Sequence, residues 1–127
     1  MKWLTWDKGR QDSGYEKMLL ATSKFFKFDC YILKFPDGVG IPTHVDPSIP
    51  GYEHHRFNFF LTTPSIGTGV VTIEGPHWET KHGRAHKFRP DLYQHHMTPA
   101  RRIWSNNATY ILSIGWLKKK VYKHQEA

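Results

Sequence analysis

The residues best suited to metal chemistry are His44 and Asp46, which lie two positions apart in the stretch from Ile41 to Leu61. In an extended strand, residues i and i+2 point to the same face, so this imidazole and carboxylate can bind one ion together. An Fe(II) centre with two histidines and one carboxylate needs one more histidine and leaves positions open for substrate and O2. Further along the chain, YQHHMTP supplies His95 or His96. Adjacent residues face opposite sides of a strand, so only one of them can be the third ligand.

The elements that must position these groups are predicted to be strands. Short runs of aromatic and β-branched residues alternate with turns rich in Gly, Pro, Asn and Asp. Such a pattern is typical of a β-barrel or sandwich. The predicted strands are Cys30 to Phe35, Gly40 to Asp46, His55 to Thr62, Val70 to Glu74, Arg84 to Phe88, Gln94 to Pro99 and Thr109 to Trp116.

One helix is predicted ahead of these strands, over Ser13 to Phe28. Ser13 can cap its N-terminus, with Glu16 three residues on. Apolar side chains fall near one helical face at Tyr15, Met18, Leu19 and Phe26. We therefore expect the helix to pack on the outside of the sheet and to carry no chemistry.

The predicted strand from His55 to Thr62 places a polar pair toward the interior. Arg56, Asn58 and Phe60 share one face, and the intervening residues share the other. A polar pair facing an apolar interior costs free energy unless it has partners. A bound anion or a hydrogen-bond network must therefore satisfy Arg56 and Asn58.

Three segments resemble 2-oxoglutarate/Fe(II)-dependent oxygenases, which are double-stranded β-helix proteins. CYILKFPDGVGIPTHVDP is similar to their entry strand, glycine turn and metal strand. GRAHKFRPDLYQHHMTPA is similar to their second half, which leads to the distal histidine. RFNFFLTTP resembles a strand of aspartyl/asparaginyl β-hydroxylases whose arginine and polar residue hold a co-substrate carboxylate. The resemblance implies a mainly β, jelly-roll or cupin-like barrel with the predicted helix outside it.

For the metal, the resemblance implies His44, Asp46 and His95 as the catalytic Fe(II) ligands. His95 is favoured over His96 because the segment H-x-M-T-P-A is similar to the family's H-x-V-x-P-A, in which the first residue is the ligand.

For the co-substrate, the family commonly uses an arginine on the strand after the distal histidine, where this chain has Thr109 or Tyr110. A guanidinium suits a carboxylate because it can form two parallel hydrogen bonds. The candidates for binding 2-oxoglutarate are Arg56 with Asn58, Arg101 or Arg102 in the preceding connection, and the hydroxyl groups of Tyr31 and Ser113.

The activity implied is hydroxylation of a C–H bond in a protein side chain or small molecule. It would consume O2 and convert 2-oxoglutarate to succinate. Two alternatives remain open. One is a cupin-like metal-binding barrel, although such barrels normally carry H-x-H and a later glutamate. The other is a non-catalytic module that binds a metal, nucleic acid or a protein.

Composition limits the protein class. At 127 residues the chain, 1–127, is expected to be a single domain. One cysteine excludes an internal disulfide, and no signal peptide or membrane span is evident, so we expect a cytoplasmic protein. The net charge of +7 favours acidic partners, among them nucleic acid. An exposed edge strand would allow a homodimer as well as a monomer.

Overall fold

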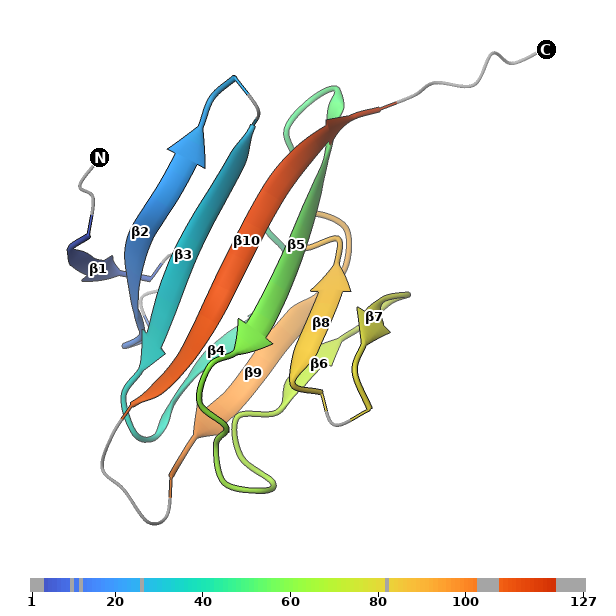
Figure 1. Ribbon diagram of the computed structural model, residues 1–127. Coiled ribbons are helices and arrows are strands. Elements are labelled where there is room, and N and C mark those ends of the chain that lie inside the picture. Colours follow the sequence, from blue (N-terminus) through green and yellow to red (C-terminus); the bar gives the residue numbers. More distant parts are fainter. Residues whose placement is uncertain are drawn as a thin grey trace.

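Two antiparallel sheets that face each other make up the fold (Figure 1). The structure is a computed structural model that describes residues 4–9, 11, 13–25, 27–81, 83–102 and 108–120. The larger sheet has the strand order β1-β2-β3-β10-β5-β8-β7, and the smaller has the order β4-β9-β6. The smaller sheet lies behind the half of the larger sheet that contains β10, β5 and β8.

The strands of the larger sheet are β1 Trp6–Lys8, β2 Glu16–Ser23, β3 Phe28–Phe35, β10 Thr109–Lys119, β5 Tyr52–Phe60, β8 Ala85–Phe88 and β7 Trp78–Glu79. Those of the smaller sheet are β4 Val39–His44, β9 His95–Ala100 and β6 Val71–Ile73. The mainly β fold predicted from the sequence is thereby confirmed, and its facing sheets are consistent with a cupin-like β-sandwich. The described ranges contain no helix.

The predicted helix over Ser13 to Phe28 is wrong. Half of this segment, Glu16–Ser23, forms β2, which pairs with β1 on one side and with β3 on the other. The register with β3 shifts between Leu19 and Ala21, where β2 contains a bulge or irregularity. A bulge interrupts strict alternation, and the apolar spacing then imitates a helical stripe. Ladder hydrogen bonds on both sides outweigh the local helical signal. Phe26 lies outside the described residues.

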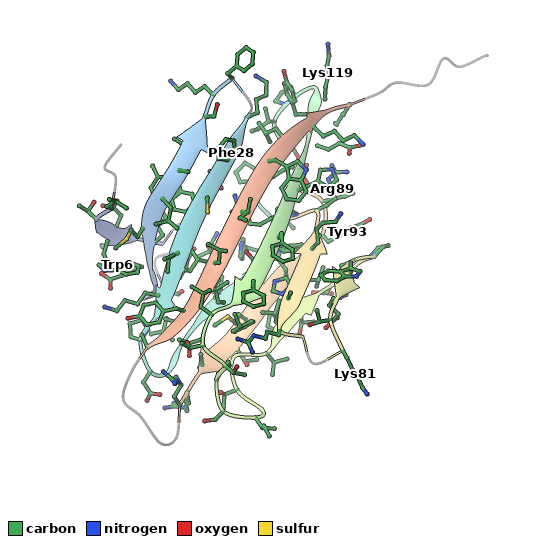
Figure 2. All side chains as sticks on the ribbon, viewed as in Figure 1. Trp6, Phe28, Lys81, Arg89, Tyr93 and Lys119 are labelled. Carbon is green, nitrogen blue, oxygen red and sulfur yellow. The ribbon has the colours of Figure 1, made fainter. Side chains whose placement is uncertain are left out.

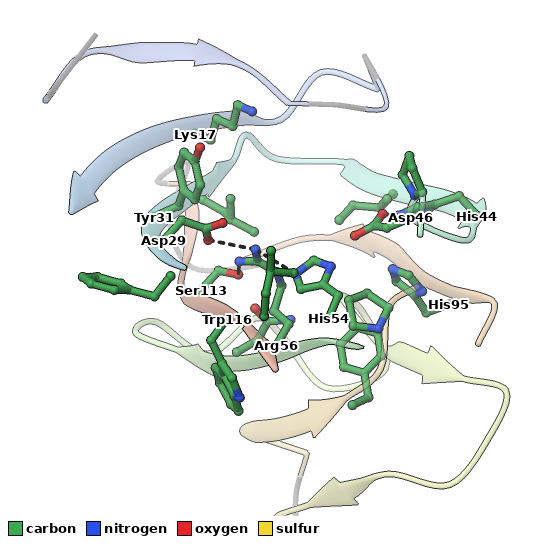
Figure 3. Close-up of a pocket in the computed structure, with 18 of the residues that line it drawn as sticks. Lys17, Asp29, Tyr31, His44, Asp46, His54, Arg56, His95, Ser113 and Trp116 are labelled. Carbon is green, nitrogen blue, oxygen red and sulfur yellow. Dashed lines mark hydrogen bonds and ion pairs between the residues drawn. The ribbon is translucent and has the colours of Figure 1, made fainter. Parts of the chain in front are cut away.

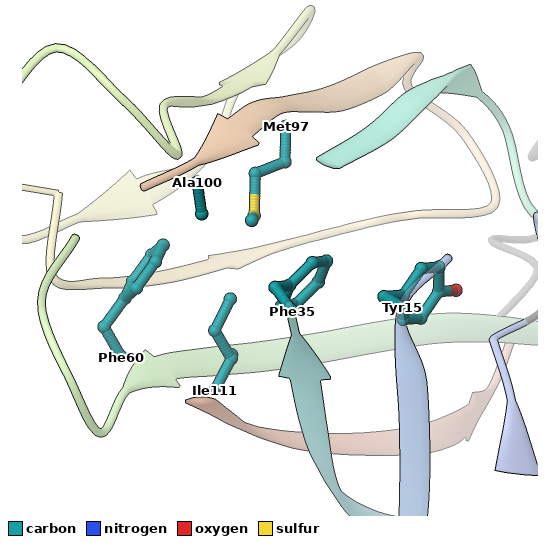
Figure 4. Close-up of a cluster of buried hydrophobic side chains, with 6 residues drawn as sticks. All are labelled: Tyr15, Phe35, Phe60, Met97, Ala100 and Ile111. Carbon is teal, nitrogen blue, oxygen red and sulfur yellow. The ribbon is translucent and has the colours of Figure 1, made fainter. Parts of the chain in front are cut away.

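A hydrophobic core fills the closed end of the sandwich (Figure 4). Phe35 is fully buried and stacks on Tyr15, with ring centroids 5.1 Å apart. The smaller sheet contributes Met97 and Ala100, and the larger contributes Phe60 and Ile111 as well as Phe35. Both sheets therefore bury one face against the same cluster.

Toward the other end, the inward face of the larger sheet becomes polar. Tyr31, Ser113 and Asn58 are cross-strand partners on β3, β10 and β5. Two positions away on each strand, Gly115 on β10 is the cross-strand partner of Asp29 on β3 and of Arg56 on β5. Alternate residues share a face, so both rows point between the sheets. The sandwich thus has an apolar end that holds it together and a polar end that surrounds a cavity.

Side chains also cover the outer face of the larger sheet (Figure 2). Phe57 stacks on Trp78, and Arg84 lies over the ring of Phe59 at 5.1 Å. These contacts agree with the predicted parity, in which Arg56 and Asn58 point the opposite way. No helix in the described residues is long and apolar enough to cross a membrane.

Substitution of Phe35 by alanine should lower the free energy of unfolding by about 3–5 kcal/mol, because it removes a fully buried ring and leaves a cavity. Phe25→Ala is the control, since that ring is 84% exposed and its loss should change stability by no more than about 0.5 kcal/mol. Urea unfolding followed by tryptophan fluorescence measures both. Equal losses in the two variants would contradict this description of the core.

Candidate metal centre and adjoining cavity

Three side chains converge at the open end of the smaller sheet (Figure 3). His44 is the last residue of β4 and His95 is the first residue of β9, and the two are cross-strand partners. Asp46 follows β4, and its Oδ1 lies 3.3 Å from Nε2 of His44. One potential ligand atom from each residue lies within 4.8 Å of the other two. The strand pairing therefore gathers two imidazoles and one carboxylate around a single point.

Both imidazoles are oriented by hydrogen bonds to the backbone. Nδ1 of His44 lies 2.8 Å from the Pro42 carbonyl, and Nδ1 of His95 lies 2.9 Å from the Tyr93 carbonyl. A carbonyl oxygen only accepts, so Nδ1 donates in each ring and Nε2 is the nitrogen left for a metal ion. Burial lowers the pKa of His95 and favours the neutral form of that ring. Imidazoles whose Nδ1 is held in this way suit a metal ion.

His96 does not join this group. It is the cross-strand partner of Thr72 on β6 and faces the opposite side of β9 from His95. The structure therefore brings His95, and not its neighbour, beside His44 and Asp46.

A charged turn positions Asp46. The Asp46 N–H donates to the Pro90 carbonyl at 2.8 Å. On either side of Pro90, Arg89 donates to both carboxylate oxygens of Asp91 at 3.0 Å, and Asp91 also accepts from the His54 N–H. Burial alone would raise the pKa of Asp91, but these hydrogen bonds hold it below its ordinary value. The ion pair between the partly exposed Arg89 and the buried Asp91 thus fixes the carbonyl that accepts from the Asp46 backbone.

A cavity of about 450 Å³ adjoins the three side chains and extends along the polar rows of the larger sheet. His44, Asp46 and His95 line one part of it. Tyr31, Ser113, Asn58, Arg56, Asp29 and His54 also line it. Figure 3 shows His54 between the Arg56 guanidinium and the three convergent side chains.

Arg56 is the central cation of this cavity. Its Nη1 donates to Oγ of Ser113 at 2.8 Å, and its Nη2 donates to Oδ1 of Asp29 at 2.8 Å. Nη2 also lies 3.3 Å from Nε2 of His54. Gly115 makes this path possible, because a Cβ there would lie 2.1 Å from Nη2. The missing side chain lets the guanidinium cross β10 and reach β3.

Asn58 and His86 form a second polar pair beside the cavity. Nδ2 of Asn58 lies 3.0 Å from Nε2 of His86, so the amide donates to the imidazole. Burial lowers the pKa of His86 to about 4, which keeps that ring neutral. Oδ1 of Asn58 is buried and has no hydrogen-bond partner among the described residues. A ligand that carries a donor could satisfy this oxygen.

The sequence-derived candidates separate into two groups. Arg56, Asn58, Tyr31 and Ser113 line the cavity, whereas Arg101 and Arg102 do not. Arg101 follows the far end of β9, roughly 20 Å from His95 at about 3.3 Å per residue. There its side chain pairs with Asp37 at 3.4 Å.

Sequence reasoning missed Asp29 and His54. Each lies two residues before a predicted cavity residue, Tyr31 and Arg56 respectively. The same alternation that indicated Arg56 and Asn58 therefore contained the signal.

Comparisons with solved structures show a shared fold. KdgF from Halomonas sp. aligns with a TM-score of 0.58 at 13% identity, over 91% of this chain and 88% of that one. A Pseudomonas putida prolyl-4-hydroxylase aligns with a TM-score of 0.62 at 13% identity, over 91% and 78%. An HTH_3 family transcriptional regulator from Vibrio cholerae aligns with a TM-score of 0.54 at 10% identity, over 88% and 56%. At these identities the likeness concerns the fold alone.

No family model matches the chain. No curated protein sequence matches it either.

Replacement of His95 by alanine should weaken the binding of a divalent metal ion by more than about 100-fold, because one of the three candidate ligands is lost. His96→Ala is the matched control, since it removes the adjacent imidazole from the opposite face of β9. Calorimetric titration with Fe(II) in the absence of oxygen measures the metal affinity of both variants. A larger loss in His96→Ala than in His95→Ala would contradict the proposed ligand set.

His86 should make stability depend on pH. Its pKa is about 4 when folded and about 6.5 when unfolded, so between these values only the unfolded chain is protonated. Its contribution is complete above about pH 6.5 and is lost as pH falls toward 4. From pH 7 to pH 5 this contribution decreases by about 2 kcal/mol.

Urea unfolding at the two pH values tests this contribution. In His86→Gln, the loss of unfolding free energy between pH 7 and pH 5 should be smaller by about 2 kcal/mol. His77→Gln is the control: the Gly75 carbonyl and Glu79 raise the pKa of His77, so its removal should not reduce the dependence. An unchanged pH dependence in His86→Gln would contradict the neutral buried ring.

Proposed function

We propose that the protein is an Fe(II)- and 2-oxoglutarate-dependent dioxygenase that hydroxylates a C–H bond of a protein side chain or small molecule. The observation that carries the proposal is the placement of His44, Asp46 and His95 in one cavity with Arg56 and Ser113. A metal site and a carboxylate-binding group within one small cavity are what a chelating 2-oxo acid requires.

The residues present fit a divalent metal. Two imidazoles whose Nδ1 atoms are bonded to backbone carbonyls, together with one carboxylate, form a donor set typical of non-haem Fe(II). When bound, Fe(II) would activate O2, which is the oxidant: one oxygen atom would enter the substrate C–H bond as a hydroxyl group, and the other would enter 2-oxoglutarate as it is converted to succinate and CO2. His44, Asp46 and His95 would hold the metal, and the Pro42 and Tyr93 carbonyls keep both rings oriented.

The residues present also fit the far carboxylate of 2-oxoglutarate. Arg56 offers a planar fork of N–H donors, and Ser113 lies at hydrogen-bond distance from it. Tyr31 and Ser113 are cross-strand partners, as are Ser113 and Asn58, so these side chains form one polar row beside the guanidinium. We propose that this row binds and orients the co-substrate while the apolar end of the sandwich excludes water.

A cupin-like metal-binding barrel without 2-oxoglutarate is the second candidate. The observation that favours it is the ion pair between Arg56 and Asp29. In this pair a carboxylate of the protein already neutralises the guanidinium that is proposed to bind the co-substrate. The carboxylate of Asp46 in an H-x-D arrangement supports the oxygenase instead, because cupin-like sites normally present H-x-H.

Addition of Fe(II) and then 2-oxoglutarate to the metal-free protein without oxygen should produce a weak visible charge-transfer band, because the co-substrate chelates the metal. The band should require both additions and should disappear in His44→Ala. His96→Ala should retain it. Metal binding without a band would favour the cupin-like alternative, and no specific metal binding would overturn both.

A further inference from the structure

The ion pair between Arg56 and Asp29 lies inside the cavity that the proposed co-substrate would enter. Both residues line this cavity, and Oδ1 of Asp29 lies 2.8 Å from Nη2 of Arg56. The Asp29 side chain is 34% exposed and that of Arg56 is 16% exposed. A solute that enters the cavity can therefore reach the carboxylate as well as the guanidinium.

The pair is built into the sheet. Arg56 on β5 and Asp29 on β3 are separated by β10, where Gly115 is the cross-strand partner of both. A side chain at position 115 would occupy the place of the guanidinium. The register of three strands and one glycine thus brings this carboxylate to this cation.

Both terminal nitrogens of Arg56 already have partners within the protein. Nη1 is bonded to Ser113, while Nη2 contacts both Asp29 and His54. A ligand carboxylate that binds both terminal nitrogens would meet the Asp29 carboxylate at the same donor. Two carboxylates at one guanidinium nitrogen repel each other, so the ligand must displace Asp29 or bind against its charge.

We propose that Asp29 competes with the far carboxylate of the co-substrate for Arg56 and so lowers the affinity of the cavity for carboxylates. A simple carboxylate gains little by displacing Asp29, because one ion pair replaces another. A 2-oxo dicarboxylate meets the same competition at its far end, but its other end can also bind the metal. Such a ligand therefore keeps enough affinity to occupy the cavity. This inference rests on the proposed function for the identity of the ligand, but the competition at Arg56 does not require the metal.

Asp29→Asn tests the competition, because it removes the charge with almost no change in shape. Asp37→Asn is the matched control: Asp37 also pairs with an arginine, Arg101, at 3.4 Å, but that pair lies outside the cavity. Arg56→Met removes the contested cation. A second variant, Asp29→Ser, and thermal unfolding of every variant separate loss of binding from loss of fold.

Two probes distinguish the competition from the proposed function. Glutarate has the two carboxylates but no oxo group, and calorimetry measures its binding to the metal-free protein. 2-Oxoglutarate is titrated with Fe(II) present and oxygen absent, and the visible band measures its binding. For both probes, Asp29→Asn should bind roughly tenfold more tightly than the unaltered protein, since a partly exposed like charge is removed. Asp37→Asn should stay within about twofold, and Arg56→Met should bind more weakly.

The outcomes separate the two ideas. Tighter glutarate binding in Asp29→Asn without any band for 2-oxoglutarate would support the competition and overturn the proposed co-substrate. A band in the unaltered protein together with unchanged or weaker binding in folded Asp29→Asn would support the function and overturn the competition. Equal tightening in Asp37→Asn would also overturn it, because the effect would then come from net charge. Binding of neither probe by any variant would overturn both.

Discussion

The pairing of β4 with β9 is the contact on which the candidate metal centre depends. It places His44 opposite His95, and the turn after β4 adds Asp46. Side chains alternate along a strand, so a slip of one residue would present His96 in place of His95. Gly40 allows β4 and β9 to approach closely, because a Cβ there would lie 2.3 Å from the Met97 carbonyl. This close approach excludes every other residue type at position 40 without a shift of the backbone.

The cavity beside the candidate metal centre depends on the larger sheet, whose inward face changes from apolar to polar along its length. Phe35, Phe60 and Ile111 hold the sheets together at one end. At the other end Arg56 can be partly buried only because Ser113, Asp29 and His54 satisfy its donors. Separating the two regions lets the core stabilise the sandwich without filling the cavity. The Arg56 guanidinium in the cavity is therefore already paired within the protein.

Local sequence patterns predicted most strands, and they identified the three side chains that the structure brings together as a candidate metal centre. The spacing of His44 and Asp46 is a strand-period signal, and the distal histidine needed only a returning strand. The helix over Ser13 to Phe28 was wrong because the irregularity between Leu19 and Ala21 disturbs that period.

The pair of Arg56 and Asp29 was missed for a different reason. No local pattern connects two residues whose contact depends on the register of β3, β10 and β5 and on a glycine between them. Arg102 shows the opposite case, in which closeness in sequence does not lead to closeness in space. It is near β10 in sequence, but the strand that precedes it runs away from the cavity, so it does not line that space.

Fold likeness does not decide between an oxygenase and a cupin-like barrel, since both kinds of site can be placed on one sandwich. The decision depends on the charges within the cavity. Asp46 would neutralise part of a divalent cation, whereas Asp29 neutralises Arg56. A ligand that binds only the metal or only Arg56 meets a positive charge that a carboxylate of the protein already neutralises in part. Under the proposed function, a ligand with a chelating group at one end and a carboxylate at the other would bind the metal beside Asp46 and would take the place of Asp29 on Arg56.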